Sequence, residues 1–480
     1  MVSISSAATD HAPLKRPPMM SGGGGLLGHA LEFAKDPDGL MERGYREHGP
    51  VFSFRLGIRT FDVLIGPEFN KLFWEQTDKA LDMARGMQFL RPLFSKKFWI
   101  WAGHKEYLRQ RAVVFPKFKV GEMKRYSGVM TEEVARLMRA MGEEGEFDIA
   151  PSIGPTIMYI AAHAFLGRAF REKFSQKYFD MFREFSLGIE GLLPLWLHWL
   201  PLKHLRRGRA GKRFFRRELG SWIRERRARP VDPPDFFQEM LAAKYEDGTP
   251  VPDDVIFQLI MFMTWAGHET TTAQTTWALT DMLKSPEWFA KVRDEVDAVL
   301  GDTPPEAITW QQLGQLKIID MVVRESERIH PIATFLQRVA NEDIIVGGYR
   351  IPERDRVVIV PRLSHLDERE FPEAQQFRPD RFDPAGECPA NMDSLIGFGG
   401  GLHRCLGVNF ARLEMKTIIA MLVQRYELEL LDPAVKVKGM TTPWPRSPCR
   451  LAWRRRAAQP KSAAAAPISK AAVDRCPVAH

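Results

Sequence analysis

The chain has few cysteines and no cysteine pairing pattern. Only four of its 480 residues are cysteines, Cys388, Cys405, Cys449 and Cys476. They form neither a Cys-x-x-Cys pair nor a spaced zinc pattern. Such sparse use is typical of proteins in a reducing compartment, so we expect free thiols and no disulfide framework.

The N-terminal region lacks targeting features. Residues 1–30 contain no apolar core of a secretory signal and no run of 18 apolar residues that could span a bilayer. We therefore expect neither export nor a membrane anchor, and we predict a cytoplasmic protein.

Nucleic-acid-binding modules are also missing, although the chain is basic. Its net charge is +8 and its sequence pI is about 9.2, which favours an anionic partner. The basic residues are not interleaved with a repeated aromatic platform. We expect no nucleic acid, and we favour an acidic protein partner over an anionic membrane surface.

The composition is that of a folded protein, with 45% hydrophobic and 27% charged residues. The length leaves open one very large domain or several ordinary ones. Residues 1–25 are rich in Ser, Pro and Gly, and residues 456–480 in Ala, Lys and Pro. We predict that both ends are flexible and that residues 26–455 form the folded part.

One stretch near the C-terminus concentrates constrained residues. Residues 398–407 read Phe-Gly-Gly-Gly-Leu-His-Arg-Cys-Leu-Gly, followed by an amphipathic helical pattern over 408–426. Consecutive glycines allow a tight turn and close approach to a flat partner. A helix start beside Cys405 should lower the thiol pKa and favour the thiolate. Cys405 is therefore a candidate metal ligand, and the alternative is a buried structural cysteine.

The longest helical pattern spans residues 253–283 and carries Ala-Gly-His-Glu-Thr-Thr at 266–271. Ala266 and Gly267 give the helix a flat patch, and threonine hydroxyls can bond to backbone carbonyls. Glu269 beside Thr270 places an acid next to an alcohol, a pair that can pass protons. By itself this pattern is most often a packing glycine with polar neighbours.

Together the two stretches resemble the haem-thiolate monooxygenases of the cytochrome P450 family. The haem loop of that family, Phe-x-x-Gly-x-(His or Arg)-x-Cys-x-Gly, is matched by Phe398, Gly401, His403, Cys405 and Gly407. The oxygen-activating pattern of its central helix is matched by Ala266, Gly267, Glu269 and Thr270. The match continues over most of the chain, from about residue 26 to 455.

The resemblance implies a mainly α fold with small β-sheets, with a long central helix over the haem and a β-rich lobe. The implied cofactor is haem b, with Cys405 as axial ligand, Phe398 beside the sulfur and His403 on a propionate. Glu269 would be the proton source, and Thr270 would hydrogen-bond to dioxygen.

Further positions match by spacing and order. The resemblance implies that Arg338, and Tyr107 with Arg111, contact the propionates, although Arg109 competes with Arg111. Glu325 and Arg328 lie three residues apart on one helix face and match the Glu-x-x-Arg pair of the family, joined by Arg381. The alternative for such a pair is an ordinary surface ion pair.

Residues 81–103 form a long aromatic stretch that is too apolar for disorder. By resemblance it walls the substrate pocket, and the candidate pocket residues are Met87, Phe89, Phe94, Trp265 and Phe335. The alternative for each is a side chain packed in the core.

An apolar segment over 192–202 precedes a basic one over 203–229, which has 12 Lys or Arg against two Glu. This combination suits a peripheral membrane contact through 192–229. By resemblance the same region is the lid over the substrate channel. The alternative is therefore a lid packed on its own protein with a solvated basic face.

Within the family, the chain is most similar to bacterial sterol 14-demethylases, for example over residues 36–41 and 447–453. Met87 stands where that branch usually has tyrosine, and Glu269 where it has histidine. We therefore expect a monooxygenase that hydroxylates a sterol, terpenoid or other lipid. Sterol 14-demethylation, an oxygen-independent or peroxide-driven reaction, and a non-catalytic haem binder remain alternatives.

The resemblance also implies a separate electron donor, because the chain has no space for a fused reductase domain. We expect a ferredoxin or flavodoxin that carries electrons from NAD(P)H, docked beside Arg404, Arg412 and Lys416 through charge steering. The alternative for these three residues is a solvated helix face. We expect a monomer.

Overall fold

A computed structural model of the chain describes residues 14–174, 176–186, 202–386, 389–435, 437–438 and 443–457. Cys388 and Cys476, residues 192–201 and the predicted C-terminal tail beyond 457 lie outside the described residues. The two described cysteines, Cys405 and Cys449, are free thiols.

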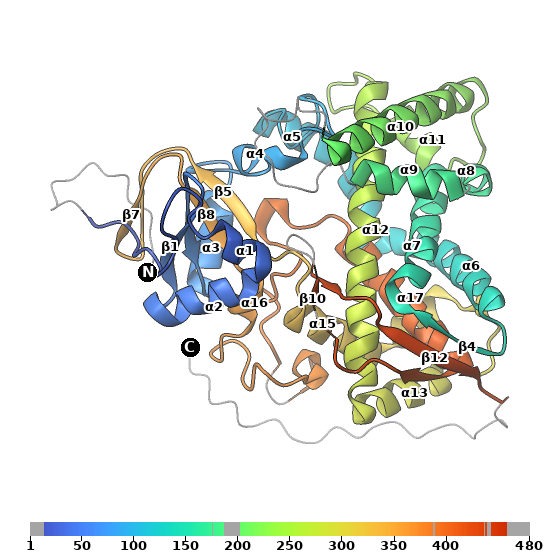
Figure 1. The fold of residues 1–480 in the computed structure, drawn as a ribbon. Coiled ribbons are helices and arrows are strands. Elements are labelled where there is room, and N and C mark those ends of the chain that lie inside the picture. Colours follow the sequence, from blue (N-terminus) through green and yellow to red (C-terminus); the bar gives the residue numbers. More distant parts are fainter. Residues whose placement is uncertain are drawn as a thin grey trace.

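The described chain is mainly helical, with its strands gathered at two places (Figure 1). The helices are α1 (Ala30–Lys35), α2 (Pro37–His48), α3 (Pro67–Gln76), α4 (Met83–Gly86), α5 (His104–Val114), α6 (Met123–Met141), α7 (Ile149–Leu166), α8 (Arg168–Lys173), α9 (Gln176–Ser186), α10 (Lys203–Ala228), α11 (Phe236–Ala242), α12 (Asp253–Leu283), α13 (Pro286–Leu300), α14 (Trp310–Gln315), α15 (Lys317–Ile329), α16 (Pro361–His365) and α17 (Val408–Arg425).

The strands are β1 (Val51–Leu56), β2 (Arg59–Leu64), β3 (Leu81–Asp82), β4 (Glu144–Asp148), β5 (Leu336–Ala340), β6 (Ile344–Val346), β7 (Tyr349–Ile351), β8 (Arg356–Ile359), β9 (Tyr426–Leu430), β10 (Val437–Lys438), β11 (Trp444–Pro445) and β12 (Arg450–Arg455). The largest sheet has the order β1-β2-β8-β5-β3 and forms a lobe with α1 to α3. A second sheet, with the order β4-β12-β9, contains the last strand of the described chain and lies beside the helical part.

The helix α12 runs through the helical part from one side to the other (Figure 1). Asp253 and Asp254 in its first turn stabilise the helix N-terminus through the macrodipole. Residues 255–261 and 271–282 are all buried, and α12 contacts α7, α15 and α17. A helix that is buried on all sides over most of its length belongs to the core, and α12 is the axis around which the others pack.

Among the described residues, α7 is the one helix with the length and apolar composition to cross a bilayer, and 72% of that stretch is buried inside the protein. Its neighbours are α12, α6 and α8, so its apolar surface serves the core.

Residues 14–25, predicted as part of an unstructured arm, instead lie along the sheet. The backbone N–H of Met20 donates to the Ser53 carbonyl at 2.9 Å, and the N–H of Ser53 donates to the Pro18 carbonyl at 2.8 Å. Arg16 pairs with Asp355. Composition alone missed this contact because it depends on an unpaired edge of β1 supplied by the rest of the fold.

Candidate functional site

The loop that carries Cys405 is held in a tight turn against α3. The N–H of Cys405 donates to the Phe398 carbonyl at 2.9 Å, which closes the loop. Gly401 has φ +60°, a conformation in which a residue with a side chain would be strained. A side chain at Gly400 would meet Trp74 Nε1 at 2.4 Å. These glycines are therefore required by the turn and by the close approach of Trp74.

Cys405 is an exposed residue, although many protein atoms crowd around its thiol. Burial raises the pKa of its thiol above the usual value, and this outweighs the opposite effects of the Gly407 N–H and of Arg404 and Arg412. The expectation of a lowered thiol pKa is therefore wrong for the protein by itself, because desolvation exceeds the effect of the helix start. Metal binding to this sulfur would be coupled to loss of the proton.

A buried ion pair supports the loop from behind. Arg412 Nη2 lies 2.7 Å from Glu327 Oε2, and the Arg412 guanidinium lies 5.2 Å from the centre of the Phe398 ring. Burial raises the pKa of Glu327, while Arg412 acts to lower it. Phe398, placed beside the sulfur by resemblance, thus forms a contact between the loop and α17.

The middle of α12 is the part of this helix that remains accessible. Residues 265–269 are half-buried and Thr270 is exposed, although the stretches on either side are buried. An added Cβ at Gly267 would meet no atom within 4 Å, so Ala266 and Gly267 present an open, flat patch. The Thr270 hydroxyl donates to the Ala266 carbonyl at 2.5 Å.

Several cationic and aromatic side chains gather on the other flank of the loop. The rings of Tyr107 and His403 lie 4.4 Å apart, and the Tyr107 hydroxyl donates to the Leu402 carbonyl at 3.3 Å. Arg338 is buried above the Phe73 ring, and burial lowers its pKa to about 10. Among described residues, Arg111 Nε is buried without a hydrogen-bond partner.

Asp78 is the member of this cluster that the sequence did not indicate. Its Oδ2 lies 2.6 Å from His403 Nε2 and 2.9 Å from His104 Nδ1. Burial acts to raise the pKa of Asp78, but these two imidazoles outweigh it and hold the pKa below the usual value. Asp78 follows α3 without a recognisable motif, so only its position beside two histidines identifies it.

Arg109 and Arg111 have different neighbours in the structure. Arg109 lies 2.5 Å from Asp247 and stacks over Tyr245, outside the cluster. Arg111 lies one turn from Tyr107, and its positive charge acts to lower the pKa of that phenol, although burial raises it overall. The cluster therefore contains Arg111.

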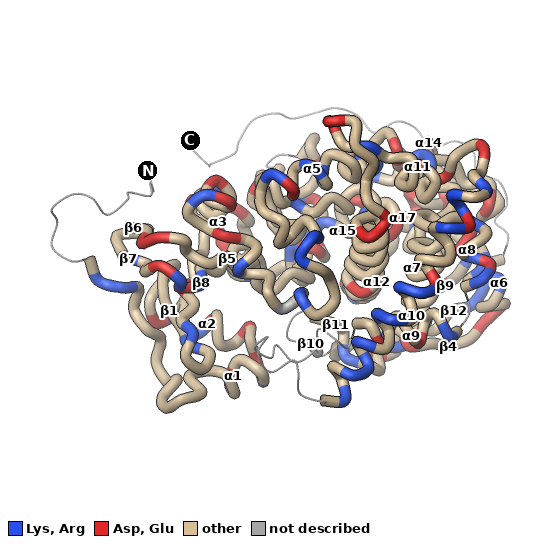
Figure 2. The backbone as a smooth tube through the Cα atoms, turned by 90° about the horizontal axis from the view of Figure 1, so that it is seen from above, with Lys and Arg blue, Asp and Glu red and all other residues tan. Residues whose placement is uncertain are grey.

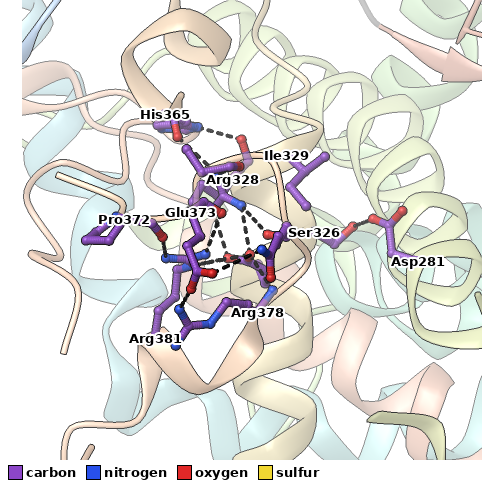
Figure 3. A network of polar contacts seen from close by, with 12 residues as sticks. Asp281, Ser326, Arg328, Ile329, His365, Pro372, Glu373, Arg378 and Arg381 are labelled. Atoms are coloured by element: carbon purple, nitrogen blue, oxygen red, sulfur yellow. Dashed lines mark hydrogen bonds and ion pairs between the residues drawn. The ribbon is translucent and has the colours of Figure 1, made fainter. Parts of the chain in front are cut away.

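Glu325, Arg328 and Arg381 form a buried ionic network (Figure 3). Arg328 donates to both carboxylate oxygens of Glu325 at 2.8 Å, and Arg381 lies 3.1 Å from the same carboxylate. Arg328 also donates to the carbonyls of residues 365, 374 and 376. The network ties α15 to the segment before the Cys405 loop, so the pair is not an ordinary surface ion pair.

The predicted pocket residues fall into two groups. The Phe94 ring lies 5.6 Å from Phe262 of α12, whose ring lies 6.1 Å from Trp265. Met87 is half-buried against the same core cluster. Phe335 lies instead 5.1 Å from Phe33, in the β-rich lobe. The side chain of Phe89 lies outside the described residues.

Two of the three predicted docking residues are not free surface cations. Lys416 is buried; its Nζ lies 2.8 Å from Asp320 and donates a hydrogen bond to the Leu313 carbonyl at 3.1 Å. Arg412 forms an ion pair with Glu327. Helical spacing placed these residues on α17 but could not show that α14 and α15 cover that face. Arg404 remains exposed.

Comparison with known proteins decides the family. The sequence pattern of the cytochrome P450 family matches residues 17–448. The chain is a cytochrome P450. As a member of this family it is a monooxygenase with a haem-thiolate cofactor, and its predicted fold is confirmed.

Named relatives share about a third or less of the sequence of this P450. A protein named sterol 14alpha-demethylase from Mycobacterium tuberculosis H37Rv is 30% identical over 424 residues, 87% of this chain and 92% of the relative. Human lanosterol 14-alpha demethylase is 27% identical over 432 residues, 90% of this chain and 85% of the relative. The solved structure "Retinoic acid bound cyanobacterial CYP120A1" superposes with a TM-score of 0.81 at 23% identity, covering 92% of this chain and 100% of that chain.

The residues of this P450 fit a haem. Cys405 is an exposed free cysteine, Ala266 and Gly267 offer a flat surface, and Arg111 has a buried N–H without a partner in the described structure. No cluster of three acidic, histidine or cysteine side chains in the described ranges could hold a metal by itself. A single thiolate with a macrocycle suits this arrangement.

Proposed function

We propose that this cytochrome P450 hydroxylates a lipophilic substrate, a sterol, terpenoid or other lipid, with electrons from a ferredoxin or flavodoxin. The observation that carries the proposal is the exposed Thr270 hydroxyl next to Glu269, in the accessible segment of an otherwise buried helix. A non-catalytic haem binder has no need for an acid and an alcohol at this position.

The positions of the residues around the Cys405 loop support their proposed roles in haem binding. Cys405 would ligate the iron, and Arg111, Arg338 and His403 would hold the propionates by charge-assisted hydrogen bonds. The haem supplies electron storage and dioxygen activation when bound. The Gly407 N–H directed at the sulfur stabilises the thiolate form of Cys405.

Thr270 and Glu269 would move protons. The Thr270 hydroxyl uses its hydrogen to donate to the Ala266 carbonyl. Both lone pairs of its oxygen therefore remain able to accept hydrogen bonds. Glu269 can supply such a proton through its carboxyl group or through water. Peroxide-driven and oxygen-independent reactions need no such relay, so the pair favours the dioxygen-dependent hydroxylase.

Aromatic side chains beside α12 support a lipophilic substrate class. Phe94 and Phe98 are buried and Phe262 is half-buried, and the centres of the three rings lie 4.8–5.6 Å apart. Sites that bind lipophilic molecules are lined mainly by such apolar and aromatic side chains. Sterol 14-demethylation is the second candidate, supported by the names of relatives at about 30% identity. Met87 and Glu269 depart from that branch, and we therefore place general lipid hydroxylation first.

We also propose that the protein works in the cytoplasm and that the basic face of α10 meets an anionic surface. Lys203, Arg206, Arg213 and Arg224 are exposed and make no ion pair with any described residue. Figure 2 shows basic positions along this part of the chain. A solvated face of the lid is the competing interpretation, and sedimentation of Arg206→Glu/Arg213→Glu with anionic vesicles separates the two.

A reduced carbon monoxide difference spectrum tests the haem assignment. We expect the Soret band that gives the family its name, and its loss in Cys405→Ala with Cys449→Ala as the matched control. The haem-loaded ferric protein, titrated with sterols, terpenoids and fatty acids, should show a shift of its Soret band with the class of lipid that it binds. A band that survives in Cys405→Ala would contradict the ligand assignment, and a response to none of the lipids would contradict the substrate proposal.

A further inference from the structure

The helix α15 carries a second buried acid two residues after Glu325. Glu325 accepts hydrogen bonds from Arg328 and Arg381. The carboxylate of Glu327 instead lies 2.7 Å from the guanidinium of Arg412 on α17. The side chains of Glu327 and Arg412 are only 2% and 14% exposed, so both ends of this ion pair are largely removed from water. We call these two residues the α15–α17 pair.

The α15–α17 pair lies against the loop that carries the cysteine. A Cβ added at Gly397 would lie 2.8 Å from Glu327 Cγ and 2.9 Å from its Oε1, so the carboxylate is in close contact with the backbone just before the loop. The guanidinium of Arg412 lies 5.2 Å from the centre of the Phe398 ring. Because the Cys405 N–H donates to the Phe398 carbonyl at 2.9 Å, the pair contacts the part of the loop that is bonded to the cysteine.

Stability alone does not explain the α15–α17 pair. Glu327 Oε1 and Arg412 Nε are buried and have no hydrogen-bond partner among the described residues. Removal of two charges from water is costly, and apolar side chains of similar volume often make a protein as stable as a buried ion pair does. Packing by itself therefore gives no reason for two charges at this place.

Both charges of the pair act on the Cys405 sulfur. Burial has the largest effect on this thiol and raises its pKa. The charge of Glu327 raises the pKa further, whereas the charges of Arg404 and Arg412 lower it. Arg404 is exposed, so water and salt screen its charge, but a buried pair is screened much less. The two members of the pair therefore have opposite and persistent effects at the sulfur.

We propose that the α15–α17 pair sets the reduction potential of the haem that Cys405 holds. One-electron reduction, with the electron from the ferredoxin or flavodoxin donor, makes the site one unit more negative. The positive charge of Arg412 therefore favours the reduced form, and the negative charge of Glu327 favours the oxidised form. Both side chains act through the sulfur and its loop, as positioning residues. The inference rests on the proposed ligation of iron by Cys405.

Redox titration of the full-length, haem-loaded protein without substrate tests the inference. In Glu327→Gln the charge of Arg412 loses its partner, and we expect the equilibrium constant for reduction to rise by about tenfold, which is about 59 mV for a one-electron couple. Removal of both charges in Glu327→Gln/Arg412→Gln should return the potential to that of the unaltered protein. Glu133→Gln is the matched control, because Glu133 is also buried and lies 2.7 Å from Arg171, on helices α6 and α8. This control should leave the potential unchanged.

Three results would overturn the inference. They are an unchanged potential in Glu327→Gln, an equal shift in Glu133→Gln, and a double variant that shifts as far as the single one, since a distorted loop and not a charge would then be the cause. Glu327→Leu makes the same change of charge and carries the test if Glu327→Gln does not retain haem.

The carbon monoxide spectrum separates this inference from the proposed ligation. If Cys405 does not ligate the iron, the band that gives the family its name is absent from the unaltered protein. If only the inference is wrong, the band is present in the unaltered protein and in Glu327→Gln, and their potentials are equal.

Discussion

The carboxylate of Asp78 lies 2.6 Å from the imidazole of His403, across 325 residues of sequence. This contact joins the end of α3 to the loop of the candidate axial cysteine. Because His403 is a proposed propionate ligand, the acid beside it fixes the orientation of its ring.

We therefore expect Asp78→Asn to weaken haem retention. A hydrogen bond to a charged group contributes about 1.5–3 kcal/mol, so the rate of haem transfer to an apo-globin acceptor should rise by roughly tenfold or more. Asp82→Asn, which removes an acid that caps α4, is the control. Equal haem loss from both variants would show that Asp78 does not position His403.

Thr270→Ala should uncouple electron use from product formation. The hydroxyl is exposed in the accessible part of α12, so we expect little change in stability but a product yield per electron lower by about tenfold or more, with peroxide in its place. Thr276→Ala is the matched control, because its hydroxyl makes the same kind of bond, to the Thr272 carbonyl at 2.8 Å, but is buried. Unaltered coupling in Thr270→Ala would remove Thr270 from the relay.

Arg404 and Lys416 should respond differently to charge removal. Arg404→Glu should slow reduction by an acidic donor by about tenfold at low salt, and the difference should shrink at high salt. Lys416→Gln leaves Asp320 without its buried partner and should lower the free energy of unfolding by about 3 kcal/mol, with little effect on the salt dependence of reduction. Stopped-flow reduction at two salt concentrations, with denaturant unfolding, checks both. A normal reduction rate in Arg404→Glu would place the donor elsewhere.

Asp62 should make stability depend on pH in the neutral range. Burial raises its pKa to about 7, although the Ser53 hydroxyl donates to Oδ1 at 2.5 Å and acts to lower it. An acid with a higher pKa in the folded state holds its proton more tightly there. The stability it contributes is complete below the unfolded pKa of 3.8 and is lost as the pH rises through about 7.

The loss should reach up to roughly 4 kcal/mol between pH 4 and pH 8. Denaturant unfolding at several pH values measures it, and Asp62→Asn should flatten the dependence. Asp393→Asn, at an exposed aspartate, should leave the dependence intact. A flat profile in the unaltered protein would contradict the prediction.

The secondary structure of the central region could be predicted because it depends on local pattern. The helical pattern over 253–283 matches α12 (Asp253–Leu283), and the helical pattern over 408–426 matches α17 (Val408–Arg425) to within one residue. Apolar periodicity and turn residues fix these elements before any tertiary contact forms. The ordered backbone of residues 14–25 was not predicted. A segment rich in polar residues and glycine becomes ordered here because it can hydrogen-bond to the edge of a sheet.

The sequence by itself determined the cysteine loop, the acid and alcohol on α12, and through them the family, because fixed spacing within one loop or one helix survives in any correct fold. The tertiary structure alone decided which charged side chains are exposed and which form ion pairs. It placed Asp78 between His104 and His403, buried Lys416 against Asp320, and paired Arg109 with Asp247. Each of these depends on partners far away in the chain, whose approach is set by packing and desolvation and not by local pattern.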